Sequence, residues 1–189
     1  MKIIGGKFKG RNFFMPKDTH ATQDLVRKAL FDILGQDLTG MSFLELFAGS
    51  GSVGLEAISR GAERVVFVEH EPMSAEIIDE NLQRLNPRSA EGYDDSYHVF
   101  TGDVFIMVKQ LAHMRKKFDI VFADPPYGLD LAKKALNLIS GYDIVHADSL
   151  VVIQHEKREA MPEREGGLVM TKQRKYGKTF LTFYAPDSD

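Results

Sequence analysis

Residues 42–61 read SFLELFAGSGSVGLEAISRG, an apolar run followed by a glycine-rich loop and then a helical pattern. The run 42–47 is typical of a buried β-strand, and 52–61 is typical of a helix that ends at Gly61. Gly49, Gly51 and Gly54 match the spacing G-x-G-x-x-G, which lets the backbone pass close to a bound nucleoside. This stretch predicts the first strand–loop–helix unit of a nucleotide-binding sheet.

Short apolar runs and helical patterns continue to alternate downstream. We expect helices at 22–35, with Thr22 as N-cap, and at 72–85, 104–114 and 129–139. Strands are expected at 64–69, 97–102, 118–123 and 149–155, and the closing pair 167–173 and 178–184 reads as an antiparallel hairpin. Nearly continuous apolar strands between helices indicate a parallel sheet covered on both faces. The expected fold is therefore α/β, with a mostly parallel seven-stranded sheet and a C-terminal antiparallel hairpin.

The bulk composition is that of an ordinary globular protein. A length of 189 residues predicts a single domain, and 43% hydrophobic residues suffice for a substantial core. The absence of cysteine agrees with a reducing cytosol. No apolar run reaches membrane-spanning length, and the first residues lack the pattern of a secretion signal. We therefore expect a cytoplasmic location.

Positive charge is concentrated in two places although the net charge is −3. Residues 1–30 are basic, and the pieces KII and NFFM around Gly5, Gly6 and Gly10 suggest a hairpin. We expect residues 1–21 to form an N-terminal basic β-hairpin extension ahead of a main domain at 22–189. A second cluster comprises Lys172, Arg174, Lys175 and Lys178. Local patches set the field that a phosphate backbone feels, but both clusters are also compatible with solvated surface loops.

Acidic residues follow three of the expected parallel strands. Glu69 ends the second strand, twenty residues after Gly49, where a carboxylate can accept hydrogen bonds from ribose hydroxyls. Glu45 precedes the glycine loop, near the expected place of a methionine amino group, and Asp103 follows the third strand, near that of an adenine amino group. Taken alone, Asp103 fits an ordinary strand-end carboxylate or helix N-cap better than a cofactor contact. This layout fits either a dinucleotide or S-adenosylmethionine as the cofactor, and the glycine spacing does not separate them.

The fourth expected strand ends in FADPPYG, residues 122–128. Asp124 and the Pro125 carbonyl offer two acceptors for the N–H groups of a nucleobase amine, and the prolines fix those acceptors in advance. Tyr127 offers a face on which an extruded base can stack. Because strand ends meet at one rim of a parallel sheet, this stretch predicts an amine-binding site beside the cofactor. An acid-capped proline turn is the alternative.

Taken together, ELFAGSGSVGLEAISRGA, VFVEHEP and FDIVFADPPYG resemble S-adenosylmethionine-dependent amino-methyltransferases. With KIIGGKFKGRNFFMP, TQDLVRKALFDIL and RKYGKTFLTFY, nearly the whole chain resembles the bacterial 16S rRNA (guanine(966)-N(2))-methyltransferase family. The resemblance implies a Rossmann-like methyltransferase fold and a single-domain, monomeric enzyme that methylates N2 of one guanine in small-subunit ribosomal RNA.

The resemblance also assigns roles to residues. It implies a target-amine site at Asp124, Pro125, Pro126 and Tyr127 and RNA contacts at Lys7, Lys9 and Arg11. It implies that S-adenosylmethionine binds at ten positions, Glu45, Phe47, Ala48, Gly49, Ser50, Gly51, Glu69, His70, Asp103 and Val104. The chain departs from the family where His20-Ala21-Thr22 replaces Arg-Pro-Thr, at Glu45 where Asp is usual, and at Lys28 where Glu is usual.

Other functions fit parts of the sequence. An amino-methyltransferase for adenine N6 shares the same motifs, although only about sixty residues follow Tyr127 and the sheet uses them. A dinucleotide-binding oxidoreductase leaves DPPY unexplained, and a non-catalytic RNA-binding protein leaves the acid-lined rim unexplained. The six histidines show no ligand spacing, so we expect no metal.

Overall fold

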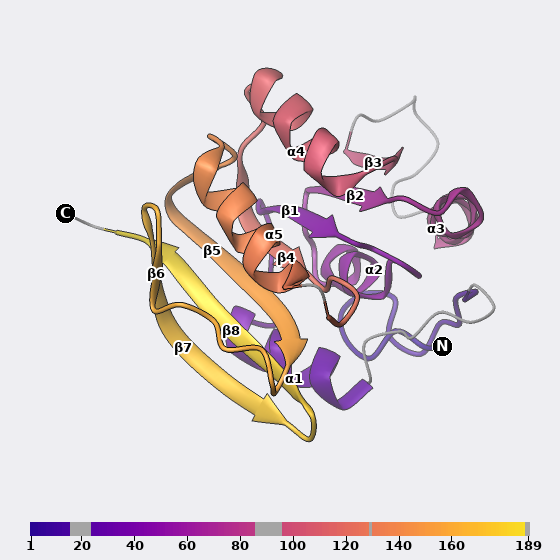
Figure 1. Cartoon of the computed structure of the whole chain (residues 1–189). Helices are drawn as coiled ribbons and strands as arrows, with labels where there is room; N and C mark the ends of the chain where they lie inside the picture. The colour runs from indigo at the N-terminus through magenta and orange to yellow at the C-terminus, as the bar shows by residue number, and fades with distance from the viewer. Residues whose placement is uncertain (16–23, 86–95, 129, 188–189) are drawn as a thin grey trace.

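The computed structural model describes residues 1–15, 24–85, 96–128 and 130–187. Its centre is one sheet with the strand order β3-β2-β1-β4-β5-β8-β7-β6 (Figure 1). The strands are β1 (Ser42–Leu46), β2 (Arg64–Glu69), β3 (Tyr97–Thr101), β4 (Phe118–Ala123), β5 (Val145–Glu156), β6 (Arg164–Glu165), β7 (Leu168–Tyr176) and β8 (Thr179–Pro186). β1 to β5 pair in parallel, whereas the remaining pairs are antiparallel. The parallel strands therefore all end at one edge, here termed the carboxyl edge.

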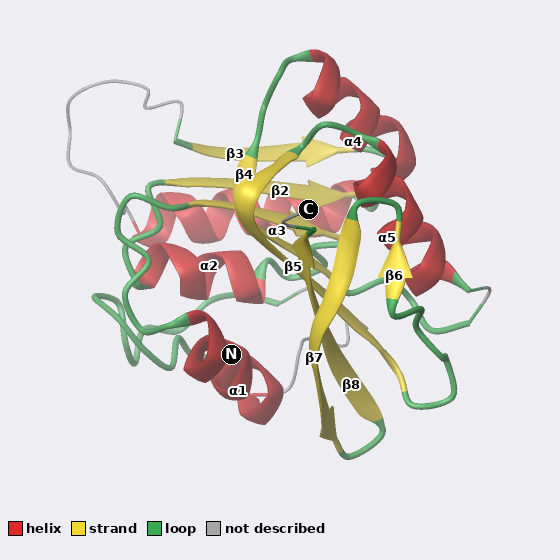
Figure 2. Ribbon diagram, turned by 90° about the vertical axis from the view of Figure 1, so that its left-hand side faces the viewer, coloured by secondary structure: helices red, strands yellow, loops and turns green. Residues whose placement is uncertain are grey.

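Helices cover both faces of the sheet, as Figure 2 shows. They are α1 (Asp24–Leu34), α2 (Ser52–Ser59), α3 (Pro72–Leu85), α4 (Val104–His113) and α5 (Leu131–Gly141). The face under α1, α2 and α3 forms one apolar cluster, and the face under α4 and α5 forms a second. Side chains alternate between these clusters along β1, where Phe43 belongs to the first and Leu44 and Leu46 to the second. The two-layer covering explains why the parallel strands read as continuous apolar runs.

The N-terminal segment, residues 1–15, packs against α1 and α2 instead of standing apart. Ile3, Phe8 and Phe13 are buried in the same apolar cluster as those helices. The amide of Ile3 donates to the carbonyl of Arg11 (3.0 Å), which gives the expected antiparallel pairing. However, the expected β-hairpin is reduced to a single bridge between Lys2 and Asn12.

The reason lies in where the backbone of this segment makes its bonds. The Lys7 amide donates to the carbonyl of Ser59 (2.6 Å), and the Phe8 amide donates to Oγ of Ser59 (2.9 Å). Gly6, with φ 70°, sits so close to α2 that a Cβ would be 1.9 Å from the Ser59 carbonyl oxygen. Contacts with α2 thus replace the cross-strand ladder of a regular hairpin. Residues 16–21 of the predicted extension lie outside the described residues.

Apart from the N-terminal hairpin, the expected helices and strands are found with shifted ends, and one strand is added. The prediction of seven strands is wrong, because the described residues form eight strands in one sheet. The additional β6 is only two residues long and polar, so it has no apolar period that sequence could reveal. β5 begins at Val145 rather than 149, and α5 extends to Gly141 rather than 139. α1 is described from Asp24, so the predicted N-cap Thr22 falls outside the described residues.

Candidate active site

The glycine loop after β1 turns sharply through left-handed backbone conformations. Phe47, Gly49 and Gly51 have φ values of 58°, 53° and 67°. Phe47 is a non-glycine residue in this region, and its ring packs edge-to-face against Phe105 with centroids 6.4 Å apart. The Gly51 amide donates to the Ala48 carbonyl (2.7 Å) and closes the turn. Local backbone strain of this kind concentrates where a ligand is held.

Glu45 caps the start of α2 from the neighbouring strand. Gly51, at the N-cap position, has no side chain to offer. Instead, the carboxylate of Glu45 accepts hydrogen bonds from the amides of Val53 (3.3 Å) and Gly54 (2.7 Å). These amides are among those that a helix leaves unpaired at its first turn, where negative charge is favoured. The structure thus shows Glu45 as a helix cap, and its predicted cofactor contact stays a prediction.

Gly54 allows α2 to lie directly on the sheet. A Cβ at this position would be 2.3 Å from the Phe67 ring and 2.8 Å from Oε2 of Glu45. Gly54 lies inside the helix, where alanine would have the higher intrinsic propensity. The glycine is therefore required by the close contact between α2 and the sheet.

Burial dominates the acid–base behaviour of Glu45. The side chain is 3% exposed, and burial raises its pKa to about 8. The two backbone hydrogen bonds act in the opposite direction, while the nearby charges of Asp124 and Glu69 raise the pKa further. Glu45, Glu69 and Asp124 thus lie close enough at the carboxyl edge for their charges to interact, and Asp103 is not among the charges that act on Glu45.

Glu69 joins the end of β2 to the glycine loop. Its Oε2 accepts a hydrogen bond from the Gly49 amide (2.6 Å), and its Oε1 accepts from the Glu71 amide (2.9 Å). His70 places Nδ1 2.9 Å from Oε1, with its side chain largely in solvent. The carboxylate is buried and fixed in orientation, as a group that receives a ligand's hydroxyls must be.

Asp103 caps α4 at the end of the loop after β3. Its Oδ1 accepts hydrogen bonds from the amides of Phe105 (2.8 Å) and Ile106 (3.1 Å). This confirms the N-cap interpretation of Asp103. Val104, next in the chain, is buried in the second apolar cluster. The cofactor roles predicted for Asp103 and Val104 stay predictions.

The loop 124–127 is fastened to three strands. The Asp124 amide lies 3.4 Å from the Leu46 carbonyl of β1, and Asp124 Oδ2 accepts a hydrogen bond from Nε2 of Gln154 on β5 (2.8 Å). Tyr127 places its hydroxyl 3.1 Å from Oγ1 of Thr179 on β8. The Tyr127 side chain is nevertheless 56% exposed, which leaves ring surface for stacking.

Sequence reasoning missed Gln154 and Thr179. Gln154 is placed by the register between β4 and β5, and Thr179 by the register between β5 and β8, and neither register can be read from the sequence. The remaining residues of the loop divide by exposure, because Pro125 is buried and Pro126 is exposed. The loop thus has a fixed inner side and an open outer side.

The N-terminal basic cluster lies away from this loop. Lys7, Lys9 and Arg11 are exposed, and Lys7 and Arg11 lie over the ring of Phe8 at 5.5 and 5.1 Å. Phe8 docks at Ser59, the last residue of α2, whereas α2 begins at the glycine loop. Eight helical residues span about 12 Å. The cluster is therefore near the opposite edge of the sheet from Asp124.

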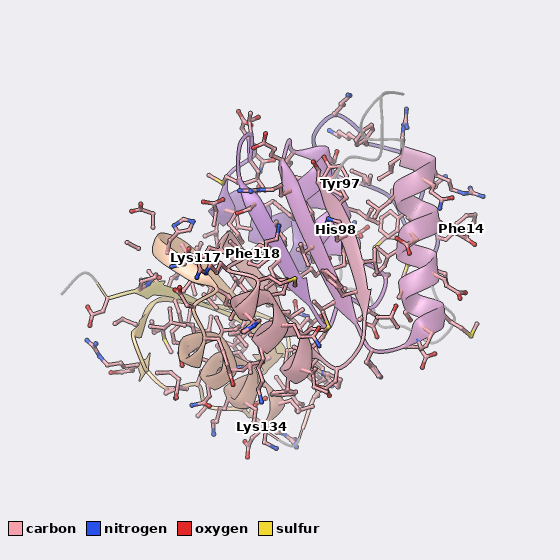
Figure 3. The ribbon with its side chains drawn as sticks, turned by 90° about the horizontal axis from the view of Figure 1, so that it is seen from above. Phe14, Tyr97, His98, Lys117, Phe118 and Lys134 are labelled. Atoms are coloured by element: carbon pink, nitrogen blue, oxygen red, sulfur yellow. The ribbon has the colours of Figure 1, made fainter. Side chains whose placement is uncertain are left out.

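A buried ionic network holds the N-terminal segment on α2. Glu56 is fully buried and accepts hydrogen bonds from the amides of Ile4 (3.0 Å) and Gly5 (2.6 Å). It also forms ion pairs with Arg60 and with Nε of Arg27 (3.4 Å). Arg27, counted by sequence among the N-terminal positive charges, is therefore an internal residue and not a surface charge. Nearby, Phe14 lies against α3 (Figure 3), where Arg84 stands 3.8 Å from its ring centre.

The second basic cluster lies on the antiparallel end of the sheet. Lys172, Arg174 and Lys175 are exposed on β7, and Lys178 is in the turn before β8. This turn is the lowest point of the molecule in both Figure 1 and Figure 2. Thr179, which contacts Tyr127, follows it directly. The hairpin β7–β8 thus places positive charge on the same side as the loop 124–127.

Among the described residues, no group of three or more His, Asp or Glu side chains is arranged to hold a metal ion. No helix in this part of the chain is both long and apolar enough to cross a bilayer.

Known proteins resemble this chain in sequence and in fold. The family model described as "Conserved hypothetical protein 95" matches residues 1–185. "Putative rRNA methyltransferase YlbH" of Bacillus subtilis is 32% identical over 97% of this chain and 98% of its own length. "Ribosomal RNA small subunit methyltransferase D" of Escherichia coli K12 is 26% identical over 97% of this chain and 89% of its own.

The fold agrees with the sequence match. The solved structure described as "Putative methyltransferase yhhF from Escherichia coli" superposes with a TM-score of 0.85 at 25% identity, over 100% of this chain and 99% of that one. The fold is thus the Rossmann-like methyltransferase fold that the sequence predicts. Because a single family model spans the chain from its N-terminal segment to β8, the chain belongs to the conserved hypothetical protein 95 family, which includes proteins named ribosomal RNA small subunit methyltransferase D.

Proposed function

We propose that this chain transfers the methyl group of S-adenosylmethionine to the exocyclic N2 amino group of a guanine in small-subunit ribosomal RNA. The observation that carries the proposal is the position of Asp124. Its carboxylate is held by Gln154 at the carboxyl edge, one strand away from the glycine loop. A fixed acceptor beside a nucleoside-binding loop is what an amino-methyltransferase needs, and the names of the relatives point to ribosomal RNA.

The cofactor site fits S-adenosylmethionine by its donor set. The Gly49–Gly51 turn permits close backbone approach, and Glu69 provides a buried, oriented carboxylate for two ribose hydroxyls. The proposed cofactor contacts are completed by six further residues, Phe47, Ala48, Ser50, His70, Asp103 and Val104. When bound, the cofactor supplies a methyl group already activated by a positively charged sulfur. The residues of this chain then have to position the acceptor nitrogen and accept its proton.

The target-amine loop would act through preset hydrogen-bond acceptors. A nucleobase amino nitrogen is a poor nucleophile because its lone pair is delocalised into the ring. Asp124 and the Pro125 carbonyl accept its two N–H groups, favour a more tetrahedral nitrogen and free the lone pair. The N–C bond forms as the S–C bond breaks, and the surplus proton on nitrogen leaves through Asp124 to water. Tyr127 offers a stacking face for the base.

The RNA would be held by the two basic clusters. Lys7, Lys9 and Arg11 lie near one edge of the sheet, and Lys172, Arg174, Lys175 and Lys178 lie on the β7–β8 hairpin. Positive side chains bind phosphates without reading sequence, so these clusters would orient the RNA and leave the choice of base to the loop. We further propose that the enzyme acts as a cytoplasmic monomer without a metal.

One experiment tests the reaction directly. Labelled S-adenosylmethionine is incubated with the protein and either ribosomal RNA lacking modifications or small subunits from the same source, and the modified base is then mapped. The expected product is N2-methylguanine at one position. Methylation of adenine N6 would instead support an adenine-directed enzyme. Calorimetry with S-adenosylhomocysteine and with NAD separates both outcomes from an oxidoreductase, which would bind only NAD.

A further inference from the structure

Gln154 stands beside Asp124 on the same face of the sheet. Ala123 of β4 is paired with Ile153 of β5, so the next residues along the two parallel strands, Asp124 and Gln154, are neighbours. The amide Nε2 of Gln154 donates to Oδ2 of Asp124 (2.8 Å). The Gln154 side chain is 5% exposed. It is therefore a buried part of the wall against which Asp124 rests.

The other end of this amide lacks a partner among the described residues. Oε1 of Gln154 is buried and accepts no hydrogen bond from any of them. Buried polar atoms are nearly always paired, so an unpaired acceptor beside the proposed amine site calls for a partner that the described residues do not supply. The orientation of the amide is fixed by Asp124, because turning it over would place Oε1 against a carboxylate oxygen. Gln154 therefore presents its oxygen, and not its NH2 group, on the side away from Asp124 as long as the hydrogen bond to Asp124 is kept.

We propose that Oε1 of Gln154 accepts the N1–H of the target guanine, so that Gln154 selects guanine over the other bases that carry an amino group. This inference rests on the proposed function and adds the recognition of the base to it. Guanine presents a ring N–H next to its N2 amino group. Adenine and cytosine present a ring nitrogen lone pair at the corresponding place, next to N6 and N4. An acceptor fixed beside the amine-binding carboxylate pairs with the first and repels the other two.

Gln154 has a positioning role at the same time. The single donor bond from Nε2 orients the Asp124 carboxylate, and Asp124 in return orients the acceptor. Removal of Gln154 therefore lowers the rate through Asp124 and also abolishes the discrimination between bases. Only the second effect is specific to base recognition, so it has to be measured as a ratio between two substrates.

The test uses RNA that carries either guanine or 2-aminopurine at the mapped position. 2-Aminopurine keeps the 2-amino group but has an unprotonated N1. We expect wild-type protein to favour guanine by about tenfold to a hundredfold in kcat/KM, the usual effect of leaving a buried acceptor unpaired. The variant Gln154→Met has similar volume and no polar atom. Its ratio is expected to fall to within about threefold of unity.

A second glutamine provides the matched control. Gln36, which follows α1, donates from Nε2 to Oδ1 of Asp32 (3.0 Å), and it belongs to neither proposed site. Gln36→Met should keep the wild-type ratio. Should Gln154→Met be too slow to assay, Gln154→Glu decides, because it keeps an acceptor, while the proton that it shares with Asp124 makes Asp124 a weaker acceptor. Its rate should fall while guanine stays preferred, and equal use of both bases by Gln154→Glu would overturn the proposal.

The remaining outcomes separate the two proposals. Wild-type protein that methylates no guanine in either RNA contradicts the proposed function itself. Wild-type protein that methylates guanine and 2-aminopurine equally well leaves the proposed function standing and overturns the role of Gln154. An unchanged preference for guanine in Gln154→Met does the same.

Discussion

The backbone amide of Gly49 donates a hydrogen bond of 2.6 Å to Oε2 of Glu69, which joins the turn after β1 to the end of β2. The two residues are twenty positions apart, and the sequence predicts that both meet the cofactor. This hydrogen bond therefore couples the position of Glu69, the proposed ribose acceptor, to the conformation of the glycine turn. A change at Glu69 should therefore disturb both.

Replacing Glu69 with Gln should weaken cofactor binding. The substitution removes the negative charge that accepts from Gly49 and puts an amide donor where one carboxylate oxygen stood. Hydrogen bonds to charged groups contribute about 1.5–3 kcal/mol, so the Kd for S-adenosylhomocysteine should rise about tenfold to a hundredfold by calorimetry. Glu71→Gln, at an exposed neighbour, should leave the Kd unchanged. An unaltered Kd in Glu69→Gln would contradict the proposed cofactor site.

Replacing Asp124 with Ala should separate chemistry from cofactor binding. Asp124 is proposed to meet the base and not the cofactor, and removal of one preset acceptor typically costs about 100- to 1000-fold in rate. Methyl transfer should fall by that factor in single-turnover assays, while the Kd for S-adenosylhomocysteine stays within about threefold. Asp148→Ala removes an exposed carboxylate from β5 and is the control. Equal reduction of binding and transfer would contradict the role given to Asp124.

Glu45 should make stability fall as pH rises. Its pKa is about 8 in the folded protein, against an ordinary value of 4.5. Between these values the folded state holds a proton that the unfolded state has released. The free energy of unfolding should therefore fall with pH, by up to about 1.4 kcal/mol per pH unit from this group.

The variant Glu45→Gln has no such titration. Urea unfolding of both proteins at several pH values between about 5 and 8 measures the contribution of Glu45 as the difference between their slopes. Parallel slopes would show that Glu45 is ionised in the folded protein.

If the basic clusters bind RNA, they should contribute to the salt dependence of RNA affinity. Replacing Lys7, Lys9 and Arg11 with Ala, or Lys172, Arg174 and Lys175 with Ala, should weaken RNA binding. The plot of log K against log salt concentration should become shallower by about 0.7–0.9 for each phosphate that the variant no longer neutralises. A third triple variant, Lys116, Lys133 and Lys134 to Ala, removes the same charge elsewhere, with Lys134 on α5 (Figure 3). A cluster whose removal changes the slope no more than this control is a solvated surface.

Gly54→Ala should destabilise the fold despite the better helix propensity of alanine. The new Cβ would meet the Phe67 ring at 2.3 Å, and overpacking of this kind typically costs about 1–3 kcal/mol. Urea unfolding at a fixed pH measures the decrease in stability. Gly141→Ala is the control, because a Cβ there has open space around it. Equal stability of the two variants would show that α2 can shift away from the sheet.

Residues at the carboxyl edge could be predicted from the sequence because the patterns that mark strand ends are local. Glu69 and Asp124 each end an apolar run, and parallel strands necessarily bring such ends together. Gln154 could not be found in this way, since its importance depends on the register between β4 and β5. Residue type alone placed it within an unremarkable strand.

Charge was the least reliable guide. Arg27 was counted among the N-terminal positive charges, because charged side chains are rarely buried without a partner. In the fold Glu56 is that partner, and the pair binds the N-terminal segment to α2. The same network explains why residues 1–15 form so little regular strand, which their alternating glycines and apolar residues did not reveal.

β8 follows β6 and β7 in the chain, yet it lies between β5 and β7 in the sheet. On the ribosome, where a chain emerges from its N-terminus, β1 to β5 can pair before β8 exists, but β7 and β6 have no strand to join. The contact between Thr179 and Tyr127 also waits for β8. A nascent chain can therefore complete the edge that carries Gly49 and Glu69 before its DPPY loop is fastened, so the order of synthesis delays the fastening of this loop until β8 has emerged.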